Sequence, residues 1–101
     1  MLVEFSILPV GKGESLSDFV AKVVSLVAKS GLPYKVTEMG TLVEGDWDEV
    51  FDLIKRCHAT LFGESGRLVT TIKVDDRKGR TDLLKTRLNS LESKVGATLQ
   101  K

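Results

Sequence analysis

The segment Thr37-Glu38-Met39-Gly40-Thr41 contains the residues best suited to hold a small ligand. A glycine between two short β-prone runs permits a kink or a bulge. Hydroxyl and carboxylate groups beside such a bend converge, and a few convergent polar groups next to an apolar slot are what a small-molecule pocket needs. A plain hairpin turn explains the same residues, so the sequence leaves both interpretations open.

Three other combinations could do chemistry, but each has a simpler interpretation. The stretch Gly11-Lys12-Gly13-Glu14-Ser15 lies where phosphates often bind, between a predicted strand and a predicted helix, but it lacks the spacing of a P-loop. A turn that ends in a capping serine accounts for it.

The adjacent Cys57 and His58 cannot share one helix face, and the chain has no second cysteine or histidine for a metal site or a nucleophile–base pair. Asp75-Asp76 is either a solvated turn or part of a polar-ligand site.

Composition narrows the class of protein. The chain has 101 residues, of which 42% are hydrophobic and 29% charged, as expected for one globular domain over residues 1–101. Fifteen basic and 14 acidic residues leave a net charge of +1, which gives no electrostatic reason to expect nucleic acid or an anionic membrane as partner. With one cysteine, no apolar run of about 18 residues and no basic N-terminal region, we expect a cytoplasmic protein.

The hydrophobic pattern predicts the elements that position these residues. Strands are expected at residues 2–9, 34–37, 41–44 and 67–75, where apolar and polar residues alternate or β-prone residues cluster. One helix is expected from a cap at Ser15 to a stop at Gly31. A second begins at Asp46, with Glu49 in the capping-box position, and ends at Gly63 and Gly66. A last helix begins at about Thr81.

This order predicts an α+β, ferredoxin-like βαββαβ sandwich, with a four-stranded antiparallel sheet, two helices on one face and an added C-terminal helix. The inner stripe of the second helix is expected to consist of Trp47, Val50, Phe51, Ile54, His58 and Leu61. The expected core consists of Val3, Phe5, Ile7, Phe19, Val20, Val23, Val27, Phe51, Ile54, Leu61, Leu68, Ile72 and Val74.

Two apolar surfaces remain without a partner inside this architecture. The reverse face of the sheet would carry Leu2, Leu8 and Val69, and the last helix has a narrow seam of Leu84, Leu88, Leu91 and Val95. We therefore expect copies of the chain to associate through sheet faces, strand edges and C-terminal helices. The alternative is that the last helix folds over its own sheet.

Three stretches of the chain together resemble a known family. They are Ser6–Gly11, Tyr34–Gly45 and Thr70–Arg77, with Pro-x-Gly after the first strand, Met-Gly-Thr in the middle and Asp-Asp-Arg after the last strand. These stretches look like the UPF0045 family, also called the MTH1187/YkoF-like or thiamine-binding protein family. The resemblance covers nearly the whole chain, with all elements in order.

The resemblance implies a non-catalytic protein that binds thiamine or its hydroxymethylpyrimidine moiety, with subunits paired into homodimers and homotetramers. In that reading Ser6, Glu38, Thr41 and Thr71 would supply donors and acceptors, Tyr34 or Phe5 would cover the ring, and Glu44 or Asp75 would face the thiazolium cation. The candidate ligand-binding residues are Ser6, Tyr34, Glu38, Met39, Gly40, Thr41, Glu44, Thr71 and Asp75, with no catalytic residue, metal or cofactor.

Two other functions compete with this one. The chain could be a regulatory or structural homo-oligomer that binds a different small ligand, such as an anion at the Arg77-Lys78-Arg80 turn. An enzyme is disfavoured because the sequence shows no recognisable nucleophile–base pair or metal set.

Overall fold

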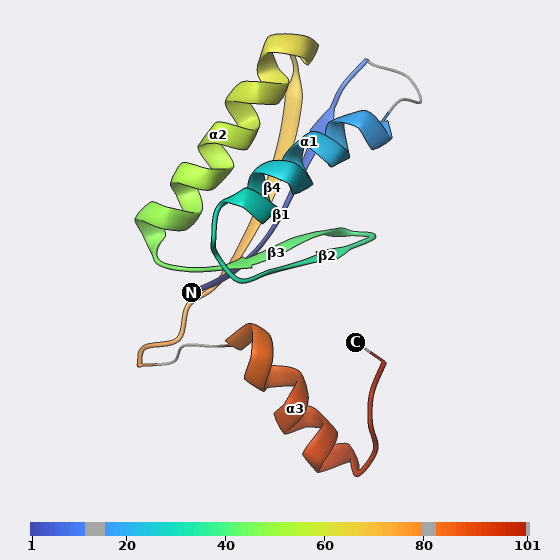
Figure 1. Cartoon of the computed structure of the whole chain (residues 1–101), viewed down its shortest axis with the longest axis vertical. Coiled ribbons are helices and arrows are strands. Elements are labelled where there is room, and N and C mark those ends of the chain that lie inside the picture. The colour runs from blue at the N-terminus through green and yellow to red at the C-terminus, as the bar shows by residue number, and fades with distance from the viewer. Residues whose placement is uncertain (12–15, 80–82, 101) are drawn as a thin grey trace.

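The computed structural model describes residues 1–11, 16–79 and 83–100, and it confirms the predicted ferredoxin-like architecture (Figure 1). The elements in chain order are β1 (Leu2–Pro9), α1 (Leu16–Lys29), β2 (Tyr34–Thr37), β3 (Gly40–Glu44), α2 (Trp47–Ser65), β4 (Leu68–Asp75) and α3 (Leu83–Val95). The strands form a four-stranded antiparallel sheet in the order β2-β3-β1-β4, and α1 and α2 cover one face of it. The predicted cap at Ser15 and helix start at Thr81 lie outside the described residues.

Strand β1 lies in the middle of the sheet and fixes which side chains face the helices. Val3 is opposite Val43 of β3 and Val74 of β4, and directly opposed residues of antiparallel strands point to the same face. Val3, Phe5 and Val43 are buried in the core between the sheet and the two helices. The predicted alternation of β1 is therefore confirmed, with Leu2, Glu4, Ser6 and Leu8 on the other face, here called the open face.

Helix α1 buries a narrower stripe than its sequence predicts. Phe19, Val23 and Val27, one turn apart, are buried in the core. Val20 was expected in the core but is 52% exposed. The wide apolar arc of this helix exceeds what the sheet can cover, so Val20 lies at the rim, where it lines a pocket described below.

Helix α2 begins and ends largely where its sequence predicts. The Asp46 carboxylate accepts a hydrogen bond from the Glu49 backbone N–H at 2.8 Å, and the Glu49 side chain accepts one from the Asp46 N–H at 3.2 Å. This capping box confirms the predicted start. The helix ends at Gly66, whose φ of 73° is a left-handed conformation that favours glycine. The prediction that Gly63 also ends the helix was wrong, because the helix runs through it to Ser65.

The buried face of α2 is rotated from the predicted one. The residues it buries are Val50, Leu53, Ile54, Cys57 and Leu61, whereas Trp47 is 55% exposed and Phe51 and His58 are half-buried. Both sets have helical spacing, so periodicity alone could not choose between them. The compact aliphatic side chains pack against the sheet, and the ring-bearing residues are left along one flank.

Strand β4 is an edge strand, and its exposure follows from that position. Ile72, opposite Phe5 on the helix-facing side, was expected in the core but is 38% exposed because no strand lies beyond it. On the open face Lys73 is directly opposite Glu4.

Helix α3 stands apart from the rest of the molecule (Figure 1). The radius of gyration is 15.0 Å, above the value of about 13 Å expected for a compact chain of 100 residues. Of its seam, Leu84 and Leu88 are half-buried, while Leu91 is 47% and Val95 56% exposed. No helix among the described residues is long and apolar enough to cross a membrane.

Candidate functional site

The Met-Gly-Thr segment forms a tight hairpin between β2 and β3. Thr37 and Gly40 are paired at the end of the ladder, so Glu38 and Met39 make the connection. The Thr37 hydroxyl donates to the Gly40 carbonyl oxygen at 2.8 Å and accepts from the Met39 N–H at 3.3 Å. These two bonds hold the turn in one shape, which places the Glu38 side chain at the rim of the sheet.

Gly40 brings this hairpin against the central strand. A Cβ atom at position 40 would lie 3.1 Å from the Phe5 carbonyl oxygen and 3.4 Å from the Glu4 side chain. No φ strain is involved; the requirement for glycine comes from the close approach of two backbones.

A pocket of about 280 Å³ opens where the hairpin, β1 and α1 meet, and we call it the bend pocket. Its walls are mostly apolar and come from the helix-facing side of the sheet and from α1, and its polar groups come from the hairpin and β1. The lining residues are Phe5, Ser6, Ile7, Leu8, Val20, Val23, Val36, Thr37, Glu38, Met39, Gly40 and Thr41. An apolar slot with a few polar groups on one side is the usual composition of a small-ligand site.

Five of the nine predicted ligand-binding residues lie together at this pocket: Ser6, Glu38, Met39, Gly40 and Thr41. Thr41 is 6% exposed and stands opposite Phe5, so its hydroxyl is the polar group set deepest among the apolar walls. Glu38 and Met39 are exposed at the mouth. The arrangement offers a hydroxyl inside the pocket and a carboxylate at its entrance.

Tyr34 and Thr71 lie away from the bend pocket lining. Tyr34 is at the other end of β2, opposite Val43, and its ring is 42% exposed. Thr71 is directly opposite Ser6 on the open face of the sheet. Val20 and Val36 were not predicted to line a pocket, although the alternation along β2 places Val36 on the same face as Thr41.

Glu44 has a structural partner at the opposite end of β3. Its carboxylate accepts hydrogen bonds from the backbone N–H groups of Leu83 at 2.7 Å and Leu84 at 3.3 Å, and the residue is 7% exposed. A carboxylate at a helix N-terminus satisfies free N–H groups and complements the helix dipole. Glu44 therefore anchors α3 to the sheet and lies far along the strand from the bend.

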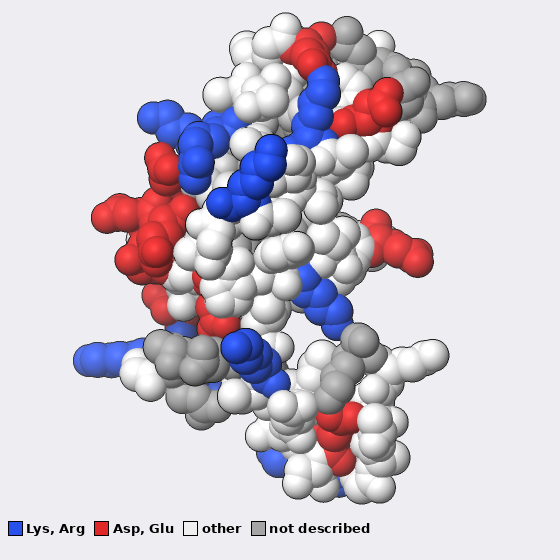
Figure 2. All heavy atoms as spheres, viewed as in Figure 1, with Lys and Arg blue, Asp and Glu red and all other residues white. Residues whose placement is uncertain are grey.

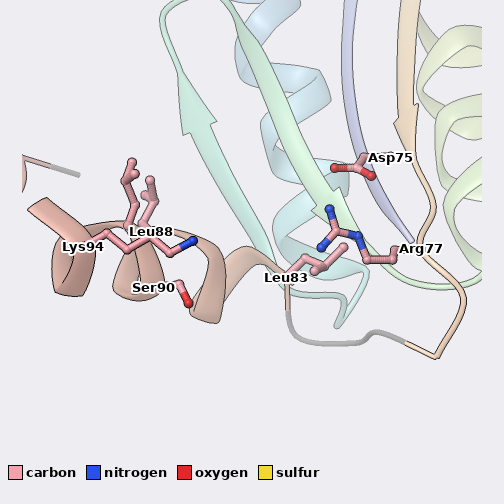
Figure 3. Close-up of a pocket in the computed structure, with 7 residues that line it drawn as sticks. Asp75, Arg77, Leu83, Leu88, Ser90 and Lys94 are labelled. Atoms are coloured by element: carbon pink, nitrogen blue, oxygen red, sulfur yellow. The ribbon is translucent and has the colours of Figure 1, made fainter.

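Asp75 lines a second cavity, of about 470 Å³, between the end of β4 and α3 (Figure 3). Its side chain and that of Arg77 point toward one another in this view, while Ser90 and Lys94 extend from α3. The lining residues are Asp75, Arg77, Leu83, Leu88, Ser90, Leu91 and Lys94. The predicted set of nine residues is thus divided between the two ends of the sheet.

Cys57 is poorly placed for nucleophilic chemistry. Burial raises the pKa of the Cys57 thiol above its ordinary value, which disfavours the nucleophilic thiolate. Within residues 1–11, 16–79 and 83–100, no group of three or more His, Cys, Asp or Glu side chains is arranged to hold a metal ion.

Comparison with known proteins gives a consistent picture. Residues 3–92 match the family described as thiamine-binding protein. The UPF0045 protein MJ1052 of Methanocaldococcus jannaschii is 34% identical over 91 residues, which cover 90% of this chain and 91% of that protein. A UPF0045 protein of Methanothermobacter thermautotrophicus is 36% identical over 95 residues, covering 91% of this chain and 96% of the relative. The crystal structure of MJ1052 aligns with a TM-score of 0.82 over 89% of this chain and 93% of that chain.

Proposed function

Because the chain belongs to the thiamine-binding protein family, also named UPF0045, we propose that it binds thiamine or the hydroxymethylpyrimidine moiety of thiamine in the bend pocket. The observation that carries this proposal is the pocket itself, where an apolar slot, a deep hydroxyl and a carboxylate meet at the hairpin. The protein would act without catalysis as a cytoplasmic carrier, buffer or sensor.

The chemistry of an aminopyrimidine matches the groups at the bend. Its exocyclic amine needs an acceptor, which the Glu38 carboxylate supplies, and its ring nitrogens need a donor, which the Thr41 hydroxyl supplies. Phe5 and the valines of the walls would cover the faces of the ring. The Met39 side chain at the mouth completes the proposed set, together with Ser6, which borders the pocket although its side chain is on the open face.

The size of the pocket limits how much of the ligand it takes. Its 280 Å³ lies just below the range of about 300–1,000 Å³ that drug-sized ligands occupy. One aromatic ring with its substituents fits, and the thiazolium ring of thiamine would extend past Glu38 toward solvent. The carboxylate at the mouth would then favour the cation, in the role that the sequence assigned to Glu44 or Asp75.

Isothermal titration with thiamine and with hydroxymethylpyrimidine tests this proposal. We expect both to bind, because the pocket accommodates the ring they share. Thr41→Val should weaken binding of both ligands about 2- to 10-fold, the usual worth of one neutral hydrogen bond, and Glu38→Gln should weaken thiamine more, because it removes a charge.

Thr71→Val is the matched control, since it removes the same hydroxyl from the open face. It should leave both affinities unchanged. No heat at millimolar ligand would exclude the function, and a loss of affinity in Thr71→Val together with full affinity in Thr41→Val would exclude the bend pocket as the site.

A second candidate function rests on the cavity beside α3. Arg77 and Lys94 line it together with the Ser90 hydroxyl, a set that suits an anion (Figure 3). Arg80, the other basic residue of the predicted anion site, lies outside the described residues. Under this alternative, phosphate would raise the melting temperature and thiamine would not.

We also propose that copies of the chain assemble through the open face of the sheet and α3, as homodimers or homotetramers. Leu8 and Val69 are 50% and 48% exposed on that face, and α3 leaves much of its apolar seam uncovered. Apolar residues gathered in this way are typical of a contact surface.

A further inference from the structure

The charge at the mouth of the bend pocket is negative. Among the described residues that line the pocket, the one ionisable side chain is Glu38, which is exposed at the mouth. Figure 2 shows acidic atoms that project from the tip of the β2–β3 hairpin, with basic atoms below it on the side of α3. A ligand that enters the pocket therefore passes a carboxylate.

Two basic residues that adjoin the pocket walls in the chain point elsewhere. Lys22 lies on α1 beside the wall, but its ammonium group forms an ion pair with Glu64 of α2. Lys35 precedes the wall residue Val36 on β2, and because side chains alternate along a strand it lies on the open face of the sheet, opposite Leu42. Neither ammonium group offsets the negative charge at the mouth.

The chemistry of the ligand decides which of its groups meets this charge. The exocyclic amine and the hydroxymethyl group of hydroxymethylpyrimidine are on neighbouring ring carbons, so an amine that donates to Glu38 brings the hydroxymethyl oxygen to the mouth as well. The ring methyl group is directly across the ring from the hydroxymethyl group and points inward, toward the apolar walls. The free alcohol keeps an O–H that can donate to the carboxylate, which is a charge-assisted hydrogen bond.

A phosphate ester on the same oxygen turns this attraction into repulsion. The ester loses the O–H donor and carries a charge of about −1.5 to −2 at neutral pH. It would place that charge within a few ångströms of the Glu38 carboxylate, at a mouth that is open to water. Like charges at such a distance weaken binding about tenfold even in a medium of high dielectric constant.

We propose that the bend pocket selects the unphosphorylated alcohol over its phosphate ester, and that Glu38 is the residue that determines this specificity. The inference rests on the proposed function and adds the class of ligand to it. Thiamine phosphates carry their phosphate groups on the far side of the thiazolium ring, where water and salt screen them from Glu38. The pocket should therefore distinguish thiamine from its phosphates by at most about threefold.

Isothermal titration with hydroxymethylpyrimidine and with its phosphate ester, at low ionic strength, tests the specificity. In the unchanged protein the ester should bind about tenfold more weakly than the alcohol. In Glu38→Gln the difference should shrink to within about threefold, and in Glu38→Lys the ester should bind more tightly than the alcohol. Asp48→Asn is the matched control, because it removes a carboxylate from the first turn of α2 and should keep the tenfold difference.

The two compounds together separate this inference from the proposed function. If the alcohol binds and the ester binds as tightly or more tightly, the proposed function stands and the inference is overturned. A difference that persists unchanged in Glu38→Gln and Glu38→Lys, or that does not narrow as salt is added, also overturns it, because an electrostatic origin requires both changes. No heat from either compound excludes the proposed function and this inference together.

Discussion

The two ends of strand β3 have different structural roles. At its first residues, Gly40 and Thr41, the strand approaches β1 closely and forms part of a pocket built from core side chains. At its last residue, Glu44, a buried carboxylate holds the N-terminus of a helix that has few other contacts with the sheet. The first end is shaped by tight packing and the second by two charge-assisted hydrogen bonds. We therefore expect substitutions at the first end to change ligand binding at the bend, and substitutions at the second end to change the attachment of α3.

The largest difference between an effect at α3 and an effect at the bend should come from Leu88→Asp on α3. If the seam of α3 packs against another copy, a charge there costs several kcal/mol at the contact. Light scattering should show a fall in the mass of the assembly, while thiamine affinity at the bend stays the same. An unchanged mass would refute this placement of α3.

Glu44→Ala should release α3 without disturbing the bend. Each lost hydrogen bond to a charged acceptor is worth about 1.5–3 kcal/mol, and α3 has little else to hold it. Hydrogen exchange should show faster exchange of α3 amides and unchanged protection in β1 and β3. Glu44→Gln keeps an acceptor oxygen and should have an intermediate effect. If α3 retains full protection in Glu44→Ala, the anchor lies elsewhere.

Gly40→Ala should act at the bend alone. The new methyl group would meet the Phe5 carbonyl oxygen at 3.1 Å, so the hairpin must shift, at a cost of about 1–3 kcal/mol in the free energy of unfolding. Thiamine affinity should fall and the assembly should remain. Denaturant unfolding and calorimetric titration measure the two effects.

Gly63→Ala is the control for this change, because nothing lies within 4 Å of its added methyl group inside α2. It should stabilise the protein by about 0.5–1 kcal/mol. Equal destabilisation by both alanines would contradict the close approach at Gly40.

The sequence predicted the sheet, the helices and the capping box of α2, because local periodicity and cap residues determine them. It did not predict which arc of α2 is buried, since Trp47, Phe51 and His58 share the helical spacing of the aliphatic residues. The bend was recognised from Gly40 and its polar neighbours. The role of Glu44 depends on a contact with Leu83 across 39 positions of the chain, which no local pattern reveals.

The most direct test of the proposed function is a map of amide chemical shifts during titration with hydroxymethylpyrimidine. The proposal predicts that saturable shifts centre on residues 5–8 and 36–41 and on Val20 and Val23, where β1, the hairpin and α1 enclose the bend pocket. Shifts that centre instead on Glu44, Asp75 and the residues of α3 would place the ligand at the other end of the sheet and contradict the account.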